Sequence, residues 1–175
     1  DTTFGIRTIL FDKDKGFFLN GKPVKILGTC NHQDHAGVGS ALPDRLQYYR
    51  IERLKQFGIN AYRTSHNPPT AELLEACDRL GMLVMDEAFD MWRIPKVKNG
   101  LSKFFDRWSE TDLRDMIRRD RNHPSIVLWS AGNEIGEQST PDGAQVLRRL
   151  VDIFHREDPT RPVTTGNDNI VADGH

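Results

Sequence analysis

The stretch Leu80-Gly81-Met82-Leu83-Val84-Met85 decides the fold, because it joins the end of a helical pattern to a short apolar run through a single glycine. A glycine directly after a helix can adopt the left-handed conformation that ends the helix and releases the chain into a strand. The same arrangement occurs at Phe57-Gly58-Ile59. Short helix-to-strand connections of this kind are typical of units in which parallel strands alternate with helices.

The alternation of strands and helices extends along most of the chain. A hairpin is expected first, with strands at 9–11 and 17–19 and a second turn at 20–23. Short apolar runs then predict strands at 24–27, 59–63, 82–85, 126–129 and 163–165. Apolar residues at helical spacing predict helices at 44–57, 70–80, 105–122 and from Thr140 to about Phe154. The apolar face expected for the first of them consists of Leu46, Tyr49, Leu54 and Phe57. Thr70 and Thr140 are placed to cap the second and fourth of these helices.

Strands that are buried on both faces and joined by helices form either an open doubly wound sheet or a closed (β/α)8 barrel. The residues that follow the first expected strand, Gly28-Thr29-Cys30-Asn31-His32, do not form the glycine-rich loop of a dinucleotide-binding sheet. A barrel needs about 250 residues, and the chain has 175. We therefore expect an α/β protein with about the first half of a TIM barrel, roughly strands one to five, preceded by a short β-hairpin.

Composition excludes several classes of partner. Lys and Arg number 24 against 25 Asp and Glu, for a net charge of −1, so neither nucleic acid nor an anionic membrane is an expected partner. Apolar runs such as 82–85 are too short to cross a bilayer, and residues 1–3 contain neither an initiator Met nor a signal-peptide core. A soluble protein with a cut or processed start is expected. Cys30 and Cys77 are the two cysteines, and both are expected to be buried free thiols.

Polar side chains collect at the carboxyl ends of four successive expected strands, which is where barrel enzymes carry their chemistry. Each has a structural explanation when taken alone: Asp86 can cap a loop, Arg63 can pair with a carboxylate, and Asn133-Glu134 can begin a helix. Ionisable groups at four consecutive strand ends are not needed for folding, so together they predict a pocket. The groups are Asn31, His32, Asp34 and His35, then Arg63, Ser65 and His66, then Asp86, Glu87 and Asp90, and finally Asn133 and Glu134.

Several ordered motifs resemble glycoside hydrolase family 2, and within it the β-galactosidases most closely. They are Asn60-Ala61-Tyr62-Arg63-Thr64-Ser65-His66-Asn67-Pro68-Pro69, Asp86-Glu87-Ala88-Phe89-Asp90, Arg119-Asp120-Arg121-Asn122-His123-Pro124-Ser125 and Trp129-Ser130-Ala131-Gly132-Asn133-Glu134. The segments 4–7 and 18–23 resemble the passage from the immunoglobulin-like domain of that family into its barrel. The resemblance therefore implies a linker over residues 1–22 and a partial catalytic barrel over residues 23–175.

The resemblance also implies a retaining hydrolysis of terminal β-glycosidic bonds, most closely of β-galactosides. Glu134 occupies the position of the acid/base carboxyl group, and the nucleophilic Glu belongs to the seventh strand, beyond this chain. Asn133 matches the residue that hydrogen-bonds the sugar 2-hydroxyl group. Arg63 matches the residue that orients the nucleophile and keeps it ionised.

Three further residues match sugar-binding positions. His32 and His66 match residues that contact sugar hydroxyl groups, and Asp34, beside them, ranks after them as a substrate-binding residue. His123 precedes the fourth expected strand of the barrel, at the end away from the pocket, so we expect a structural role for it.

No metal or other cofactor is expected. Some β-galactosidases of the family hold magnesium with a Glu and a His just past the third strand, where this chain has Asp90-Met91-Trp92-Arg93. Met91 and Arg93 are poor ligands for a hard cation. Trp92 is interpreted either as a ring that stacks on the sugar or as a core or rim residue, and the sequence leaves both interpretations open.

Other interpretations remain at this stage. The activity can be another one of the family, β-glucuronidase or β-mannosidase. A metal-dependent barrel hydrolase would use His32 and His66 with Asp34 or His35 to activate water, and a non-catalytic barrel would only bind sugar. The expected partners are a carbohydrate substrate, the remaining half of the barrel and the β-sandwich domains of a longer chain. A homo-oligomer is left open, as is a periplasmic or cytoplasmic location in a bacterium.

Overall fold

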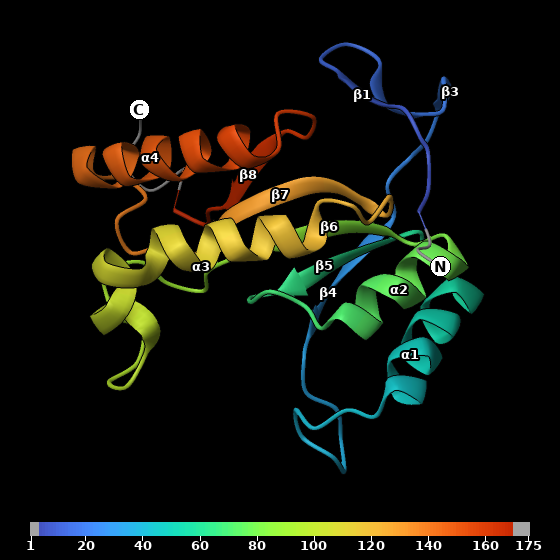
Figure 1. Ribbon diagram of the computed structural model, residues 1–175, viewed down its shortest axis with the longest axis horizontal. Coiled ribbons are helices and arrows are strands. Elements are labelled where there is room, and N and C mark those ends of the chain that lie inside the picture. The colour runs from blue at the N-terminus through green and yellow to red at the C-terminus, as the bar shows by residue number, and fades with distance from the viewer. Residues whose placement is uncertain (1–3, 170–175) are drawn as a thin grey trace. The chain divides into compact units, whose positions relative to one another are not determined.

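The computed structural model describes residues 4–169 (Figure 1). Its strands are β1 (Ile9–Asp12), β2 (Gly16–Leu19), β3 (Lys22–Pro23), β4 (Gly28–His32), β5 (Ala61–Ser65), β6 (Leu83–Glu87), β7 (Ile126–Asn133) and β8 (Val163–Gly166). Its helices are α1 (Asp44–Gln56), α2 (Ala71–Leu80), α3 (Phe105–Asp120) and α4 (Pro141–Glu157), with a short 3₁₀ helix, η1 (Leu101–Phe104), before α3. No helix within this part of the chain has the length and apolar character that a membrane span requires.

The order of the strands identifies the fold. β1, β2 and β3 form a separate antiparallel sheet, and the other five strands form a sheet in the order β4-β5-β6-β7-β8. The pairs β5/β6 and β7/β8 are parallel. A doubly wound sheet reverses its strand order at a switch point, whereas a barrel adds each strand beside the one before it. The predicted α/β fold, with the first five strands of a TIM barrel, is confirmed.

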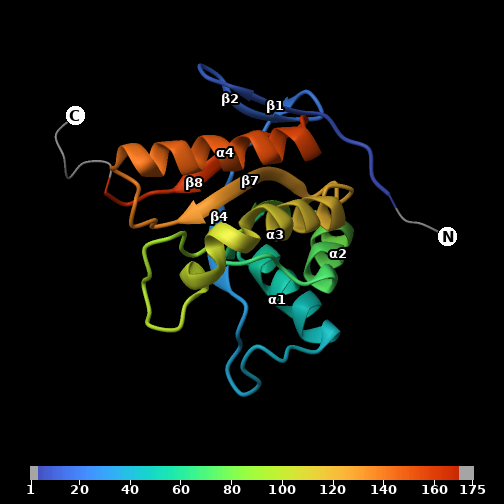
Figure 2. The same cartoon turned by 60° about the vertical axis from the view of Figure 1, so that its left-hand side comes forward.

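The chain divides into two compact units, of which the first comprises Asp1–Thr64, Pro69–Met85 and Asp120–Val127. In this unit α1 and α2 lie side by side in both views (Figures 1 and 2). Its core includes Ile51 of α1 and Leu74 of α2, both fully buried, and Tyr62 of β5, whose pKa burial raises to about 12. The two glycine junctions form as predicted, since Gly58 and Gly81 both have positive φ.

The first barrel strand begins later than predicted. The apolar run 24–27 is not a strand, and β4 begins at Gly28. The side chain of Asn60 explains the difference, because it takes the hydrogen-bonding place of a neighbouring strand: Oδ1 accepts from the Leu27 amide at 2.7 Å, and Nδ2 donates to the Lys25 carbonyl at 2.9 Å. The Asn60 side chain, together with backbone bonds from the Val24 amide to the Phe17 carbonyl and from the Asn60 amide to the Leu27 carbonyl, therefore holds the run outside a regular strand.

Two predictions about burial in the first unit are wrong. The apolar face predicted for the first helix was Leu46, Tyr49, Leu54 and Phe57, but the buried residues of α1 are Gln47 and Ile51. A glutamine at a buried position breaks the apolar periodicity on which the prediction rested. Cys77 is buried as predicted, whereas Cys30 is exposed on β4, where burial alternates along the strand.

The second unit comprises Ser65–Pro68, Asp86–Arg119 and Leu128–His175, of which residues up to 169 are described. Its two long helices, α3 and α4, lie side by side in both views (Figures 1 and 2). Arg118 pairs with Glu157 at 2.8 Å, and Arg149 donates to the Ser109 hydroxyl at 2.9 Å. The predicted cap is confirmed, since Thr140 Oγ1 accepts from the Gly143 amide at 3.0 Å.

Candidate functional site

A buried carboxyl group, that of Glu87 at the end of β6, organises part of the second unit. Glu87 is fully buried, and two donors converge on it. His66 Nδ1 lies 2.6 Å from Oε1, and the Ser130 hydroxyl donates to Oε2 at 2.6 Å. The contact between Nδ1 and the carboxyl group restrains the orientation of the His66 ring. Glu87 therefore holds a predicted sugar-binding histidine in one orientation.

The end of β7 is irregular just where the predicted proton donor begins. The register between β7 and β8 shifts between Ser130 and Asn133, which marks a bulge. Gly132 is required there, because a Cβ would lie 2.7 Å from Ile135 Cδ1 and 3.0 Å from Trp92 Nε1. Bulges of this kind bend a strand and redirect the side chains that follow. Packing against Ile135 and Trp92 thus explains why the motif Ala131-Gly132-Asn133 has a glycine at its centre.

Glu134 follows directly and has a left-handed backbone, with φ of 43°. Its amide donates to the Gly166 carbonyl of β8 at 2.6 Å, and its side chain is 57% exposed. Such a conformation is costly for a residue with a Cβ other than Asn or Asp. Strained residues of this kind cluster at active sites. The backbone of Glu134 is therefore an independent reason to examine it as a functional residue.

A second polar cluster surrounds Asn133 and Glu134. Asn133 is buried and donates from Nδ2 to Asp90 Oδ1 at 3.1 Å. Lys96 Nζ donates to the same oxygen at 2.8 Å and to the Asn133 carbonyl at 2.9 Å, and it lies 3.9 Å from Glu134 Oε2. Burial alone would raise the pKa of Asp90, but hydrogen bonds from Lys96 and Asn133, and the positive charge of Lys96, hold that pKa below its ordinary value.

The residues after the third strand have structural partners. Trp92 is 2% exposed, donates from Nε1 to the Ala131 carbonyl at 3.0 Å and stacks near Phe105. Of the two interpretations left open, the core position is the one observed. Arg93 pairs with Asp106 at 2.7 Å and with Asp142 at 2.9 Å. Within residues 4–169 no group of three or more His, Cys, Asp or Glu side chains is arranged to hold a metal ion.

The remaining predicted site residues belong to the first unit. Arg63 of β5 donates from Nη1 to Cys30 Sγ at 3.2 Å. His32 and Asp34 are exposed at and just after the end of β4. Arg50 of α1 anchors this segment, because Nη2 donates to the His32 carbonyl at 2.5 Å and Nη1 to the Gln33 carbonyl at 3.1 Å. The backbone that carries His32 is thus fixed by a helix of the same unit.

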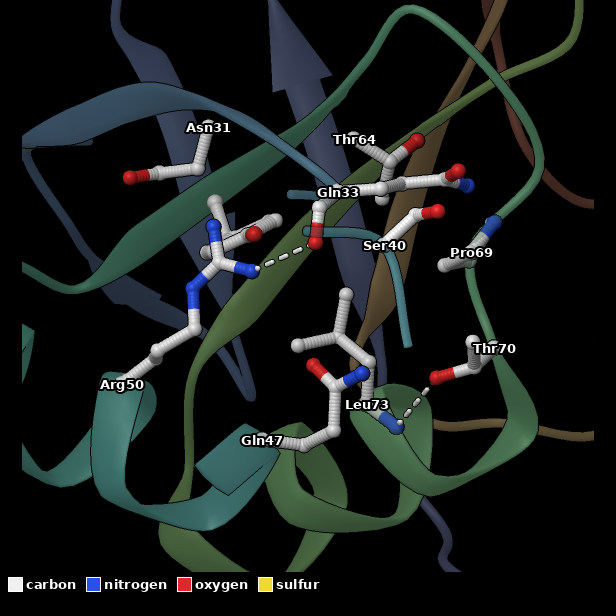
Figure 3. Close-up of a pocket in the computed structure, with 10 residues that line it drawn as sticks. Asn31, Gln33, Ser40, Gln47, Arg50, Thr64, Pro69, Thr70 and Leu73 are labelled. Carbon is white, nitrogen blue, oxygen red and sulfur yellow. Dashed lines mark hydrogen bonds between the residues drawn. The ribbon is translucent and has the colours of Figure 1, made fainter. Parts of the chain in front are cut away.

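A cavity of about 30 Å³ lies beside Arg50, as Figure 3 shows. Its lining includes Asn31, Gln33, Thr64 and the buried Gln47. The space suits about one or two water molecules rather than a sugar ring. This cavity is therefore not the sugar pocket.

The structure groups the predicted site residues within each unit. His66, Asn133 and Glu134 belong to the second unit, and Arg63, His32 and Asp34 belong to the first. Two groups in the second unit were missed from the sequence. Ser130 is a second donor to Glu87, and although it lies in the motif 129–134, nothing in that motif indicates which residue it contacts. Lys96 lies nine residues past β6 in an irregular segment, where sequence periodicity gives no signal.

The family described as glycosyl hydrolases family 2, TIM barrel domain, matches residues 12–173. The chain belongs to this family. Among its relatives is a β-galactosidase of Bacteroides ovatus, BoGH2A, which is 42% identical over 94% of this chain and 23% of the relative. Human β-glucuronidase is 35% identical over 97% of this chain and 26% of its own length.

Solved structures of the family also match. A family 2 member from Bacteroides cellulosilyticus superposes with a TM-score of 0.94 at 48% identity, over 96% of this chain and 22% of that structure. A β-glucuronidase from Bacteroides uniformis superposes with a TM-score of 0.79 at 33% identity, over 93% of this chain and 21% of that structure. The chain therefore spans roughly a quarter or less of the length of these family 2 relatives.

Replacing Glu87 tests the orientation of His66. In the full-length enzyme we expect Glu87→Gln to lower kcat/KM about 10–100-fold. The glutamine has an NH₂ group in place of one carboxylate oxygen, so either His66 or Ser130 would face a donor instead of an acceptor. Ser130→Ala removes one donor and leaves His66 in contact with Glu87, so a smaller loss is expected. Steady-state kinetics on an aryl β-glycoside measure both, with thermal melting as the check on folding. A kcat/KM for Glu87→Gln within twofold of wild type would contradict this role.

Proposed function

We propose that the full-length protein that contains this chain is a retaining β-glycosidase that cleaves terminal β-galactosides. Glu134 is the acid/base carboxyl group in this proposal, and the nucleophile is a Glu of the seventh barrel strand, outside residues 1–175. Residues 1–22 are the linker from a preceding immunoglobulin-like domain, and residues 23–175 are the first part of the catalytic barrel. The observation that carries the proposal is the left-handed backbone of Glu134 directly after the bulge in β7.

The mechanism follows from the two tasks of an acid/base carboxyl group. In the first step the nucleophile attacks the anomeric carbon, the glycosidic bond breaks, and Glu134 gives its proton to the departing oxygen. In the second step the Glu134 carboxylate takes a proton from water as the water oxygen attacks the anomeric carbon, and the nucleophile is released. A carboxyl group with this double task must reach both the departing oxygen and a water molecule, which suits the position of Glu134 directly after the end of β7.

The other residues have supporting roles in this proposal. Asn133 hydrogen-bonds the sugar 2-hydroxyl group, an interaction that strengthens as positive charge develops on the ring. His66, oriented by Glu87, and His32 bind other hydroxyl groups, with Asp34 after them. Arg63 orients the nucleophile and favours its ionised form. The partners are the carbohydrate substrate and the other domains of the full-length chain.

Glu134 variants of the full-length protein test the acid/base role. Glu134→Ala should lower kcat on a β-galactoside with a poor leaving group by about 10²–10⁴-fold, because that oxygen needs a proton to depart. A dinitrophenyl galactoside needs no protonation, so its first step should be almost unaffected while the hydrolysis of the intermediate slows. Azide needs no base, and it should restore turnover of this substrate and form a β-galactosyl azide.

The matched control is Glu110→Gln on α3, whose exposed carboxyl group pairs with Arg156 at 2.9 Å. Its turnover should stay within about twofold of wild type, as expected for the loss of an exposed ion pair. Wild-type turnover by Glu134→Ala with poor leaving groups would reject the assignment.

β-Glucuronides are the second candidate substrate class, because several relatives are named β-glucuronidase, among them the human protein. A panel of p-nitrophenyl β-galactoside, β-glucuronide and β-mannoside distinguishes the candidates on the full-length enzyme. We expect the highest kcat/KM with the galactoside, by at least about tenfold, because a carboxylate and a hydroxymethyl group at C5 require different binding partners. A higher kcat/KM with either other sugar would overturn the galactoside assignment and leave the acid/base assignment standing.

A further inference from the structure

Lys96 is the charged group that connects the segment after β6 with the end of β7. Its ammonium group has three N–H donors. One donates to Asp90 Oδ1 at 2.8 Å, and another donates to the Asn133 carbonyl at 2.9 Å. The Lys96 side chain is 27% exposed, less than the 57% of Glu134, whose Oε2 lies 3.9 Å from Nζ. Two hydrogen bonds therefore hold the Lys96 ammonium group beside the Glu134 carboxyl group.

We propose that Lys96 is a positioning residue that fixes the backbone before Glu134 and, together with Asp90, sets the proton affinity of the Glu134 carboxyl group. The inference rests on the proposed function, because proton affinity matters only if Glu134 transfers a proton. It concerns a residue outside the motifs that resemble the family, in the irregular segment between β6 and η1.

The positioning effect follows from the two hydrogen bonds. Asn133 is held through both its backbone and its side chain. Its carbonyl accepts from Lys96, and its side-chain amide donates to Asp90. Lys96 and Asp90 also bind each other. Glu134 is the next residue, and its amide is held by Gly166. These bonds restrain the peptide that leads into the left-handed conformation of Glu134. Loss of Lys96 would release one side of this arrangement.

The electrostatic effect follows from distance and charge. At 3.9 Å the Lys96 charge acts on Glu134 without a hydrogen bond and favours the carboxylate. Asp90, paired with Lys96 at 2.8 Å, has the opposite sign and offsets part of this effect. In this proposal the two charges act on Glu134 in opposite directions: the lysine favours its carboxylate form, and the aspartate favours its protonated form.

The test is the pH dependence of kcat/KM for the full-length enzyme with an aryl β-galactoside. The alkaline limb reports the essential acid of the free enzyme, so its midpoint follows the proton affinity of Glu134. Lys96→Met removes the positive charge and should move this limb up by about 0.5–1 pH unit, a size expected for partly solvated charges about 4 Å apart. Lys96→Arg keeps the charge and should leave the limb within about 0.2 pH unit.

Asp90→Asn is the second variant of the test, and it should shift the alkaline limb in the opposite direction. It removes the negative charge that offsets Lys96, so the limb should move down. A residue with a merely structural role would lower kcat/KM at every pH without moving the limb in opposite directions. Lys103→Met is the control, since this exposed lysine contacts Asn99 at 3.4 Å and should leave the profile unchanged.

The outcomes separate this inference from the proposed function. If the limb of Lys96→Met stays in place or moves down, or if that of Asp90→Asn fails to move down, the role of Lys96 is wrong. If Lys96→Met does not fold, the Asp90→Asn arm decides. If Glu134→Ala retains full turnover with poor leaving groups, the proposed function itself fails.

Discussion

The second unit depends on the satisfaction of one buried carboxyl group. Glu87 is fully removed from water, and leaving such a group without donors would cost several kcal/mol. His66, which follows β5, and Ser130 of β7 supply the donors. The electrostatic requirement of one side chain thus fixes three chain segments at the carboxyl ends of their strands. The orientation of a predicted sugar-binding histidine is a consequence of this requirement.

The end of β7 is shaped by packing in a similar way. Gly132 leaves room for Ile135 and Trp92, and the bulge around it brings the chain to Glu134 in a left-handed conformation. Trp92 is held in the core by the Ala131 carbonyl, so it supports the strand rather than facing the sugar. Lys96 and Asp90, which carry opposite charges and pair with each other, both contact Asn133, the residue before Glu134. The packing around Gly132 and the opposite charges of Lys96 and Asp90 both restrict the position of Glu134. A proton-transferring group needs such restriction to be placed accurately.

Local sequence signals predicted the elements but not every contact between them. Gly58 and Gly81 adopt the left-handed conformation, and Thr70 and Thr140 cap their helices, because these features depend on a few neighbouring residues. The start of β4 was misplaced, since Asn60, more than thirty positions away, binds the run 24–27. The buried face of α1 was missed because a glutamine occupies part of it. Contacts between side chains that are far apart in the sequence do not produce a periodic pattern of apolar residues, so periodicity cannot predict them.

The same distinction applies to the candidate site. Strand-end polar residues were identifiable because parallel strands place their carboxyl ends at one edge. Lys96 was not, because it lies in an irregular segment. The most direct measurement is a crystal structure of the full-length Glu134→Gln variant with an uncleaved aryl β-galactoside. The account predicts the glycosidic oxygen at about 2.6–3.2 Å from the side chain at position 134. A glycosidic oxygen that instead contacts another carboxyl group, with the side chain at position 134 beyond hydrogen-bond reach, would contradict it.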